Sequence, residues 1–229
     1  MDFNEVGLVS NITVIRIEEP ILESNKKIAR QLKEFFNSKG IRVLEFLGSP
    51  GSGKTALIEL LIEVYDGDKH ELAYIGGDVA STLDTERVLR HGIQGVQVNT
   101  GGACHLEAIH IKKSLEKLDI DNVKVIFIEN VGNLICPIYF QLGSDMRILV
   151  VSVTEGEDKF IKHPMTVMNS DLIVINKMDL AKVMEVNIDK MISDARKINS
   201  KAPVILTSAR TGYGIEELAR ALQLKKLSH

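Results

Sequence analysis

Short runs of Val, Ile and Leu alternate along this chain with longer stretches in which apolar positions recur every three or four residues. The short runs are typical of strands buried on both faces, and the longer stretches of amphipathic helices. Strands are expected at 41–47, 72–75, 96–98, 123–128, 148–153, 172–175 and 204–207. Helices are expected at about 20–39, 54–65, 82–91, 105–118, 157–169, 184–199 and 214–226.

This alternation predicts an α/β fold, in which helices cover both faces of a mostly parallel sheet. Ligands of such sheets bind at the carboxyl ends of the strands. Since no repeat or linker divides the sequence, we expect a single domain over residues 1–229, with an N-terminal arm and helix at about 1–40. Residues 12–17 fit either an edge strand or an arm that reaches a neighbouring molecule.

A glycine-rich segment follows the strand expected at 41–47 and precedes an apolar helix pattern. Its sequence, G-S-P-G-S-G-K-T, fits the G-x-x-x-x-G-K-[ST] pattern of a phosphate-binding loop in the proper strand-to-helix setting. Backbone N–H groups and the helix N-terminus would surround the phosphate oxygens. Lys54 would reach the β- and γ-phosphates, and the Thr55 hydroxyl would bind Mg²⁺. The predicted contacts are Gly48, Gly51, Ser52, Gly53, Lys54 and Thr55.

A second polar motif, N-K-M-D, follows the strand expected at 172–175 and resembles the N-K-x-D motif by which GTPases recognise guanine. The Asp179 carboxylate would accept hydrogen bonds from N1–H and the amine of guanine, whereas adenine would leave it unpaired. Lys177 would cover the purine face with its stem. The later segment T-S-A-R resembles the loop that supports guanine binding. We therefore predict GTP as the nucleotide, with base contacts from Asn176, Lys177, Asp179, Ser208 and Ala209.

Carboxylates follow two other predicted strands and would face the phosphate loop. Asp78 and Asp84 come after the strand at 72–75, and Glu129 comes after the strand at 123–128, in the place of the Asp of the D-x-x-G switch. Carboxylates there can hold Mg²⁺ or orient the attacking water. The alternatives are a helix cap for Asp78 or Asp84, and a solvated strand end for Glu129. The candidate catalytic residues are Lys54, Asp78, Asp84 and Glu129, and the candidate Mg²⁺ ligands are Thr55, Asp84 and Glu129.

The two cysteines lie in segments that lead out of the predicted nucleotide site. Cys104 and His105 precede a predicted helix, and Cys136 comes shortly after Glu129. Thiolate and imidazole groups suit borderline ions such as Ni²⁺ and Zn²⁺. Because three ligands per chain are few for a closed site, a site shared across a two-fold dimer axis is favoured. The alternative is that both cysteines are ordinary buried apolar residues.

Together these motifs resemble those of the nickel-incorporation GTPases of hydrogenase maturation, the HypB family, in its archaeal type. The resemblance extends from the first predicted helix to the last and is most specific at I-E-N-V-G-N-L-I-C-P, residues 128–137. It implies a P-loop NTPase fold of the SIMIBI class, with Mg²⁺-dependent GTP hydrolysis in a GTP-dependent homodimer. It also implies nickel or zinc binding by Cys104, His105 and Cys136, and a contact from Lys162 to the partner subunit's nucleotide.

The resemblance further implies partners, namely a hydrogenase large-subunit precursor and a companion nickel-binding accessory protein. The chain departs from the family pattern near the candidate metal site. Gly102 and Ala103 replace a Lys-Glu pair, and Tyr139 and Gln141 replace two acids after the cysteine. Two alternatives therefore stay open. One is a related GTPase chaperone for a metalloenzyme of the urease or corrinoid type, and the other is a non-catalytic GTP-gated binding protein.

Composition excludes several other classes of protein. At 229 residues with 45% hydrophobic content, the chain can bury a substantial core. Its formal net charge of −3 argues against bulk binding to nucleic acid or an anionic membrane. No apolar run approaches the ~20 residues that span a bilayer, and no secretory signal pattern is present, so a cytoplasmic location is expected. Two cysteines are too few for a disulfide framework.

Overall fold

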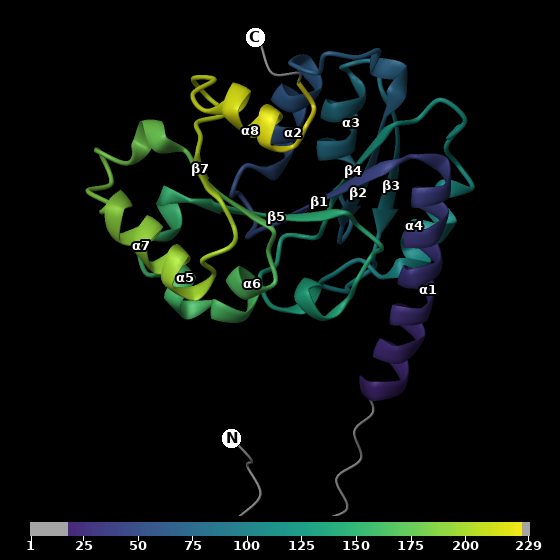
Figure 1. Cartoon of the computed structure of the whole chain (residues 1–229), viewed down its shortest axis with the longest axis horizontal. Helices are drawn as coiled ribbons and strands as arrows, with labels where there is room; N and C mark the ends of the chain where they lie inside the picture. Colours follow the sequence, from purple (N-terminus) through teal and green to yellow (C-terminus); the bar gives the residue numbers. More distant parts are fainter. Residues whose placement is uncertain (1–17, 226–229) are drawn as a thin grey trace, which may run out of the picture.

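The computed structural model describes residues 18–225, and its centre is a seven-stranded sheet (Figure 1). The strands are β1 (Arg42–Leu47), β2 (Leu72–Asp78), β3 (Gln94–Asn99), β4 (Val125–Glu129), β5 (Met146–Ser152), β6 (Leu172–Asn176) and β7 (Val204–Leu206). Their order is β3-β2-β4-β1-β5-β6-β7, and all neighbouring pairs are parallel. The predicted α/β class with a parallel sheet is therefore confirmed.

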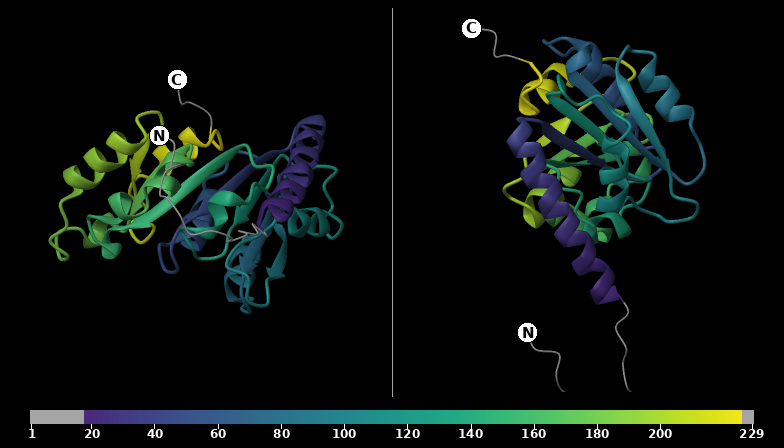
Figure 2. Two further views of the ribbon diagram at one scale, coloured as in Figure 1. Left: turned by 90° about the horizontal axis from the view of Figure 1, so that it is seen from below. Right: turned by 90° about the vertical axis from the view of Figure 1, so that its right-hand side faces the viewer.

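Helices and short 3₁₀ turns connect the strands. The helices are α1 (Glu18–Lys39), α2 (Lys54–Glu63), α3 (Leu83–Leu89), α4 (Ala108–Leu115), α5 (Lys159–Lys162), α6 (Pro164–Met168), α7 (Ile188–Ile198) and α8 (Ile215–Ala221). The turns are η1 (Lys69–Glu71), η2 (Cys136–Tyr139), η3 (Val153–Glu155) and η4 (Met178–Leu180). The helix α1 runs along one flank of the molecule and extends past it, as Figure 1 and the right-hand view of Figure 2 show.

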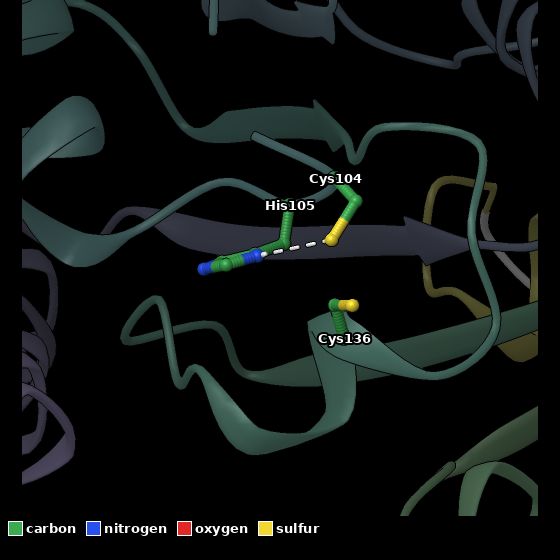
Figure 3. Close-up of side chains that lie close together, drawn as sticks. All are labelled: Cys104, His105 and Cys136. Carbon is green, nitrogen blue, oxygen red and sulfur yellow. Dashed lines mark hydrogen bonds between the residues drawn. The ribbon is translucent and has the colours of Figure 1, made fainter. Parts of the chain in front are cut away.

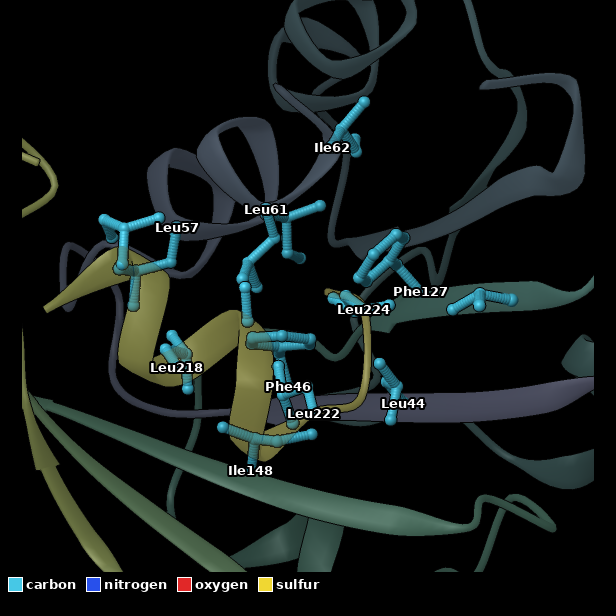
Figure 4. Packing of buried hydrophobic residues seen from close by; sticks show 14 of the residues in the cluster. Leu44, Phe46, Leu57, Leu61, Ile62, Phe127, Ile148, Leu218, Leu222 and Leu224 are labelled. Carbon is cyan, nitrogen blue, oxygen red and sulfur yellow. The ribbon is translucent and has the colours of Figure 1, made fainter. Parts of the chain in front are cut away.

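Apolar side chains on both faces of the sheet attach these helices to it. On one face, α2 and α8 pack over Phe46 and Phe127 through side chains such as Leu61 and Leu218 (Figure 4). The opposite face carries two separate apolar clusters. One joins α1 and α4 to β1, β2 and β4, and the other joins α5, α6 and α7 to β5 and β6. The central strands are thus buried on both faces, which is why their sequences are nearly continuous apolar runs.

Several predicted helices differ in extent from those observed, and two of them do so for clear local reasons. The helix expected at 157–169 is divided at Pro164, because a residue before proline avoids helical backbone angles and His163 has φ −129° and ψ 53°. The helix expected at 105–118 begins only at Ala108, since Glu107 is extended and forms a capping box with His110. Cys104 and His105 therefore lie in a loop. The segment 12–17 lies outside the described residues.

The described part of the chain contains no helix with both the length and the apolar character needed to cross a membrane.

Candidate functional site

The phosphate-binding loop lies between β1 and α2, at the carboxyl edge of the sheet. The Lys54 ammonium is buried and donates hydrogen bonds to the carbonyls of Gly48 at 3.2 Å and Ser49 at 3.3 Å, so the side chain folds back over the loop. Burial lowers the pKa of Lys54, and nearby carboxylates, Glu129 first among them, oppose this shift. Gly53 has φ 98°, and a Cβ there would lie 2.3 Å from the Asn176 amide nitrogen, so the position requires glycine.

Glu129 ends β4, the strand beside β1, and therefore faces the phosphate loop. Its carboxylate accepts one hydrogen bond from the Thr55 hydroxyl and one from the Tyr74 hydroxyl, both at 2.9 Å. Burial raises the pKa of Glu129, while the Lys54 ammonium and the two hydroxyl donors lower it. The structure thus brings together three predicted residues, Lys54, Thr55 and Glu129. The alternative of a solvated strand end does not apply, because Glu129 is 6% exposed.

Asp78 and Asp84 line the same cavity, of about 350 Å³, together with Lys54 and Glu129. Asp78 is the last residue of β2 and accepts hydrogen bonds from the backbone N–H groups of Ala80 and Ser81, which lower its pKa. Asp84 lies in the first turn of α3 and forms an ion pair with Arg87 at 3.3 Å. The N-cap of α3 is Thr82, so neither aspartate caps this helix.

The N-K-M-D motif connects the end of β6 to the phosphate loop. The Asn176 amide donates to the Ser52 carbonyl at 3.0 Å, and its oxygen accepts from the Thr207 hydroxyl and the Ala209 N–H. Lys177, with φ 64°, donates to the Gly51 carbonyl at 2.6 Å. One Asp179 oxygen accepts from the Ser208 hydroxyl at 2.6 Å. Two of the residues predicted to bind the base, Asn176 and Lys177, therefore contact the loop predicted to bind the phosphates.

Lys162 lies apart from the residues at the phosphate loop. It ends α5, is exposed, and is not among the residues that line the cavity at the phosphate loop. Its predicted contact with the partner subunit's nucleotide stays a prediction.

The structure brings Cys104, His105 and Cys136 together, with one potential ligand atom from each lying within 4.8 Å of the others (Figure 3). Cys104 and His105 come from the loop before α4, whereas Cys136 begins η2. The Cys104 sulfur lies 3.7 Å from Nδ1 of His105. The His105 ring stacks on Phe140 with centroids 3.8 Å apart, which fixes the plane of the imidazole.

The electrostatics of this cluster suit a metal ligand set. Burial lowers the pKa of His105, against the opposing effect of Glu107, so the imidazole favours its neutral, metal-binding form. Its Nε2 atom is buried without a hydrogen-bond partner. The neighbouring Cys104 thiol and burial raise the pKa of Cys136, so an ion must displace a proton to bind there. Both cysteines are partly exposed and form no disulfide.

Several residues at these sites were not predicted to have a role. Tyr74 binds Glu129, Phe140 stacks on His105, and the buried acid Glu45 accepts a hydrogen bond from Asn130. Glu45 carried a usable signal, because an acid in the middle of an otherwise apolar strand must find partners. Nothing in the sequence indicated a role for Tyr74 or Phe140, since aromatic residues are common in any core.

Comparison with known proteins places the chain in a family. A family model described as "CobW/HypB/UreG, nucleotide-binding domain" matches residues 42–206. The probable hydrogenase maturation factor HypB of Methanocaldococcus jannaschii is 44% identical over 212 residues, which is 93% of this chain and 96% of that protein.

Solved structures agree with this placement. The crystal structure of HypB from Archaeoglobus fulgidus gives a TM-score of 0.82 at 41% identity, covering 89% of this chain and 100% of that one. HypB from Helicobacter pylori, crystallised in complex with nickel, gives a TM-score of 0.82 at 34% identity, covering 87% of this chain and 94% of that one. The predicted P-loop fold of the SIMIBI class is confirmed. This chain belongs to the HypB family of hydrogenase maturation factors, within the CobW/HypB/UreG nucleotide-binding proteins.

Proposed function

We propose that this protein is a GTP-hydrolysing metallochaperone that binds nickel, or zinc, through Cys104, His105 and Cys136 and assists nickel insertion into a hydrogenase precursor. One observation carries the proposal. The three potential ligands converge to within 4.8 Å, in segments that adjoin the phosphate-facing end of β4. Ordinary core cysteines would have no reason to meet each other and an unpartnered imidazole nitrogen.

The cluster supplies too few ligands for a closed site in one chain. Structural zinc sites have four protein ligands, and a square-planar nickel site also needs four. Two copies of this chain related by a two-fold axis would supply up to four thiolates and two imidazoles. Tyr139 and Ile135, which are 52% and 57% exposed, lie beside Cys136 and would be covered in such a dimer.

GTP hydrolysis would use residues at the phosphate loop. Lys54 would neutralise charge on the β- and γ-phosphates, and Asp78, Asp84 or Glu129 would orient the attacking water. Mg²⁺, when bound by Thr55 with Asp84 or Glu129, would neutralise the phosphate charge that develops in the reaction. Hydrolysis would then alter the segment between Glu129 and Cys136 and release the ion. Lys162 would approach the nucleotide of the partner subunit.

The setting in the cell is also part of the proposal. The protein would act in the cytoplasm, as a homodimer that forms with GTP. Its partners would be a hydrogenase large-subunit precursor and a companion nickel-binding accessory protein. A related GTPase chaperone for a urease-type or corrinoid-type enzyme is the second candidate, favoured by Tyr139 and Gln141, which stand where the family has acids. Restoration of hydrogenase activity in a bacterial strain that lacks its own HypB would distinguish the two clients.

Metal titration with mass measurement tests the proposal. The apo protein is titrated with Ni²⁺ and with Zn²⁺, with GDP or a non-hydrolysable GTP analogue, while light scattering reports its mass. We expect about one ion per one or two chains, dimer formation with the GTP analogue, and loss of most binding in Cys104→Ala and in Cys136→Ala. His105→Ala should weaken binding, whereas His70→Ala, at an exposed histidine of η1, should leave it unchanged.

Turnover tests the enzymatic half of the proposal. Lys54→Ala should lower the GTP hydrolysis rate by about 100-fold or more, because a preorganised charge at the phosphates is removed. Cysteine variants that bind metal as the wild type does would refute the metallochaperone. A wild type that binds GTP without hydrolysing it would leave the non-catalytic GTP-gated binding protein as the better account.

A further inference from the structure

A buried polar network lies on one face of the sheet, between the apolar cluster under α1 and α4 and the cluster under α5 to α7. Its centre is Glu45, in the middle of β1, which is 0% exposed. One carboxylate oxygen accepts a hydrogen bond from the Asn130 amide at 3.0 Å. The other accepts from the Ser144 hydroxyl at 2.8 Å and from Nε of Arg147 at 3.3 Å.

The network reaches both segments that carry the candidate metal ligands. The oxygen of the Asn130 amide accepts a hydrogen bond from the N–H of Leu106 at 3.0 Å, and Leu106 directly follows His105. Arg147 donates to the carbonyl of Ile138 at 3.2 Å and to that of Phe140 at 3.0 Å. These carbonyls lie in and just after η2, which begins at Cys136. Glu45 therefore connects the backbone beside His105 to the backbone beside Cys136.

The same network reaches the nucleotide site. Asn130 directly follows Glu129, and it lines the cavity at the phosphate loop. A movement of Glu129 would carry Asn130 with it, because the two residues share a peptide bond. Asn130 is 1% exposed and its side chain hydrogen-bonds to both Glu45 and the N–H of Leu106, so such a movement would also affect these two residues.

Core stability alone does not account for this arrangement. Burying a carboxylate and a guanidinium costs several kcal/mol, and apolar residues of similar volume commonly serve a core as well or better. What the polar groups add here is a fixed geometry, since Asn130 and Arg147, both bound by Glu45, hydrogen-bond to backbone groups of the two ligand-bearing segments. Partners of this kind set the geometry of metal ligands and strongly affect metal affinity.

We propose that Glu45 is a positioning residue of the metal site, acting through Asn130 and Arg147 to hold the segments of His105 and Cys136 at the separation that an ion requires. The assignment rests on the proposed metal-binding function. It goes beyond that function by naming a residue that touches neither metal nor nucleotide and yet sets the affinity for metal.

The hydrogen-bond directions make the role testable. The Asn130 amide has one orientation, because the N–H groups of Leu106 and Val131 both point at its oxygen. Its NH₂ group must therefore donate to Glu45. In Glu45→Gln, the amide oxygen of the new side chain can accept a hydrogen bond from Asn130 or from Arg147, but not from both. Whichever of the two it accepts from, its NH₂ group faces the other one, which is also a donor. Adding Asn130→Asp places a carboxylate at position 130 in place of the one lost at position 45. The NH₂ group of the new side chain at position 45 can then donate to this carboxylate, and its oxygen can accept from Arg147.

The experiment compares Ni²⁺ affinity, measured by competition with a chromogenic chelator, in the wild type, Glu45→Gln, and Glu45→Gln combined with Asn130→Asp. We expect Glu45→Gln to weaken Ni²⁺ binding roughly ten- to hundredfold and the combined variant to recover most of that loss. Asp194→Asn is the matched control. It removes a buried carboxylate that pairs with Lys190 and Lys197 on α7, so it should lower Tm and leave Ni²⁺ affinity unchanged.

Arg147→Lys is the second variant, which decides the question if Glu45→Gln does not fold. A lysine keeps the charge but cannot donate to Glu45 and to two carbonyls in the fixed geometry of a guanidinium, so nickel affinity should fall. Folded variants that bind Ni²⁺ as the wild type does, or a combined variant that recovers nothing, would overturn the assignment. A wild type that binds no Ni²⁺ would instead refute the proposed function, and the assignment with it.

Discussion

At the scale of single residues, Glu129 is subject to opposing demands. In the proposed function its carboxylate would face a triphosphate and Mg²⁺, yet it is 6% exposed and burial raises its pKa. Lys54 provides a compensating positive charge, but its own pKa is lowered by burial. Perturbed groups of this kind gather at functional sites, where they are poised for a ligand that supplies the missing charge. The ligand-free protein therefore carries an electrostatic cost that Mg²⁺ and GTP should relieve.

This cost predicts a pH dependence of the free energy of unfolding. Because the folded-state pKa of Glu129 lies above its ordinary value of 4.5, the native protein retains a proton there that the unfolded chain has lost. The contribution of this proton to the free energy of unfolding is complete below pH 4.5 and is lost as pH rises through the folded-state pKa of Glu129. Urea unfolding across this range should show that loss in the wild type and not in Glu129→Gln. Equal pH slopes for the two proteins would contradict the prediction.

Asp179 is the residue that we predict to select the base. With one oxygen bound by Ser208, Asp179→Asn should exchange an acceptor for a donor at the edge that reads guanine. We expect GTP affinity to fall about 10- to 100-fold and xanthosine triphosphate affinity to rise, since an unpaired buried polar group costs about 1–3 kcal/mol. Competition binding with the two nucleotides measures the shift. Asp189→Asn, on α7, is a control, and unchanged GTP selectivity in Asp179→Asn would exclude a role in base recognition.

The sequence allowed prediction of residues whose role depends on local spacing. The phosphate loop and the N-K-M-D motif are short segments, and the structure places their side chains against one another. The metal cluster was predicted from composition and placement, and its three members do meet. Tyr74 and Glu45 were not predicted, because their partners Glu129 and Asn130 come 55 and 85 positions later in the chain. Such pairs follow from strand order, which a single sequence does not display.

At the scale of elements, the segment that follows β4 packs against the phosphate loop. Gly48 pairs with Asn133 in an isolated antiparallel bridge. Gly132 lies so close to the loop that a Cβ there would sit 2.8 Å from the Pro50 ring and 2.9 Å from its backbone nitrogen. Pro50 cannot turn away from this contact, because its ring is part of the loop backbone. The segment between Glu129 and Cys136 is therefore in direct contact with the nucleotide site.

Gly132→Ala should displace the phosphate loop. The added methyl group must push the backbone at Pro50, and displacements of about 1 Å at a catalytic site can cost about 100-fold in rate. We expect GTP hydrolysis to fall by roughly that factor while far-ultraviolet circular dichroism stays unchanged.

Gly67→Ala is the matched control for Gly132→Ala, because the atoms nearest to its Cβ would belong to the side chains of Tyr65 and Glu71 and not to the backbone of a loop. Wild-type turnover in Gly132→Ala would show that the loop does not depend on this contact.

Element boundaries were harder to predict than element types. All seven strands were expected, since burial on both faces gives most of them a nearly continuous apolar sequence, the partly exposed edge strand β3 being the exception. The start of α4 was placed too early, because His110 serves as the capping partner of Glu107 and the usual capping signal is Glu or Gln. The division between α5 and α6 comes from Pro164, whose effect a helical apolar pattern concealed. The late start of α4 leaves His105, a candidate metal ligand, in a loop.

At the scale of the whole molecule, the proposed role of Glu45 predicts that the nucleotide site and the proposed metal site are thermodynamically coupled. Glu45 and Asn130 connect them, so an ion that binds one site should respond to the nucleotide in the other. Binding couplings are reciprocal, which makes either site a test of the other.

Thermal unfolding measures this coupling. Ni²⁺ should raise Tm more in the presence of a GTP analogue than in the presence of GDP. A tenfold difference in affinity would add about 1.4 kcal/mol of stabilisation at saturating metal. The difference should vanish in Cys136→Ala, which serves as the control. Equal stabilisation by Ni²⁺ in both nucleotide states would show that the sites are independent.

The strand order also bears on how the protein is made. The strand β1 has β4 and β5 as its neighbours, and neither exists until residues beyond Val125 have left the ribosome. A nascent chain that ends earlier holds the phosphate loop and α2 without the sheet that supports them, although β2 and β3 can already pair. Pairings between distant segments form slowly and leave apolar faces exposed meanwhile. GTP binding should therefore arise late in synthesis, in a single step that also brings Glu129 and Cys136 into place.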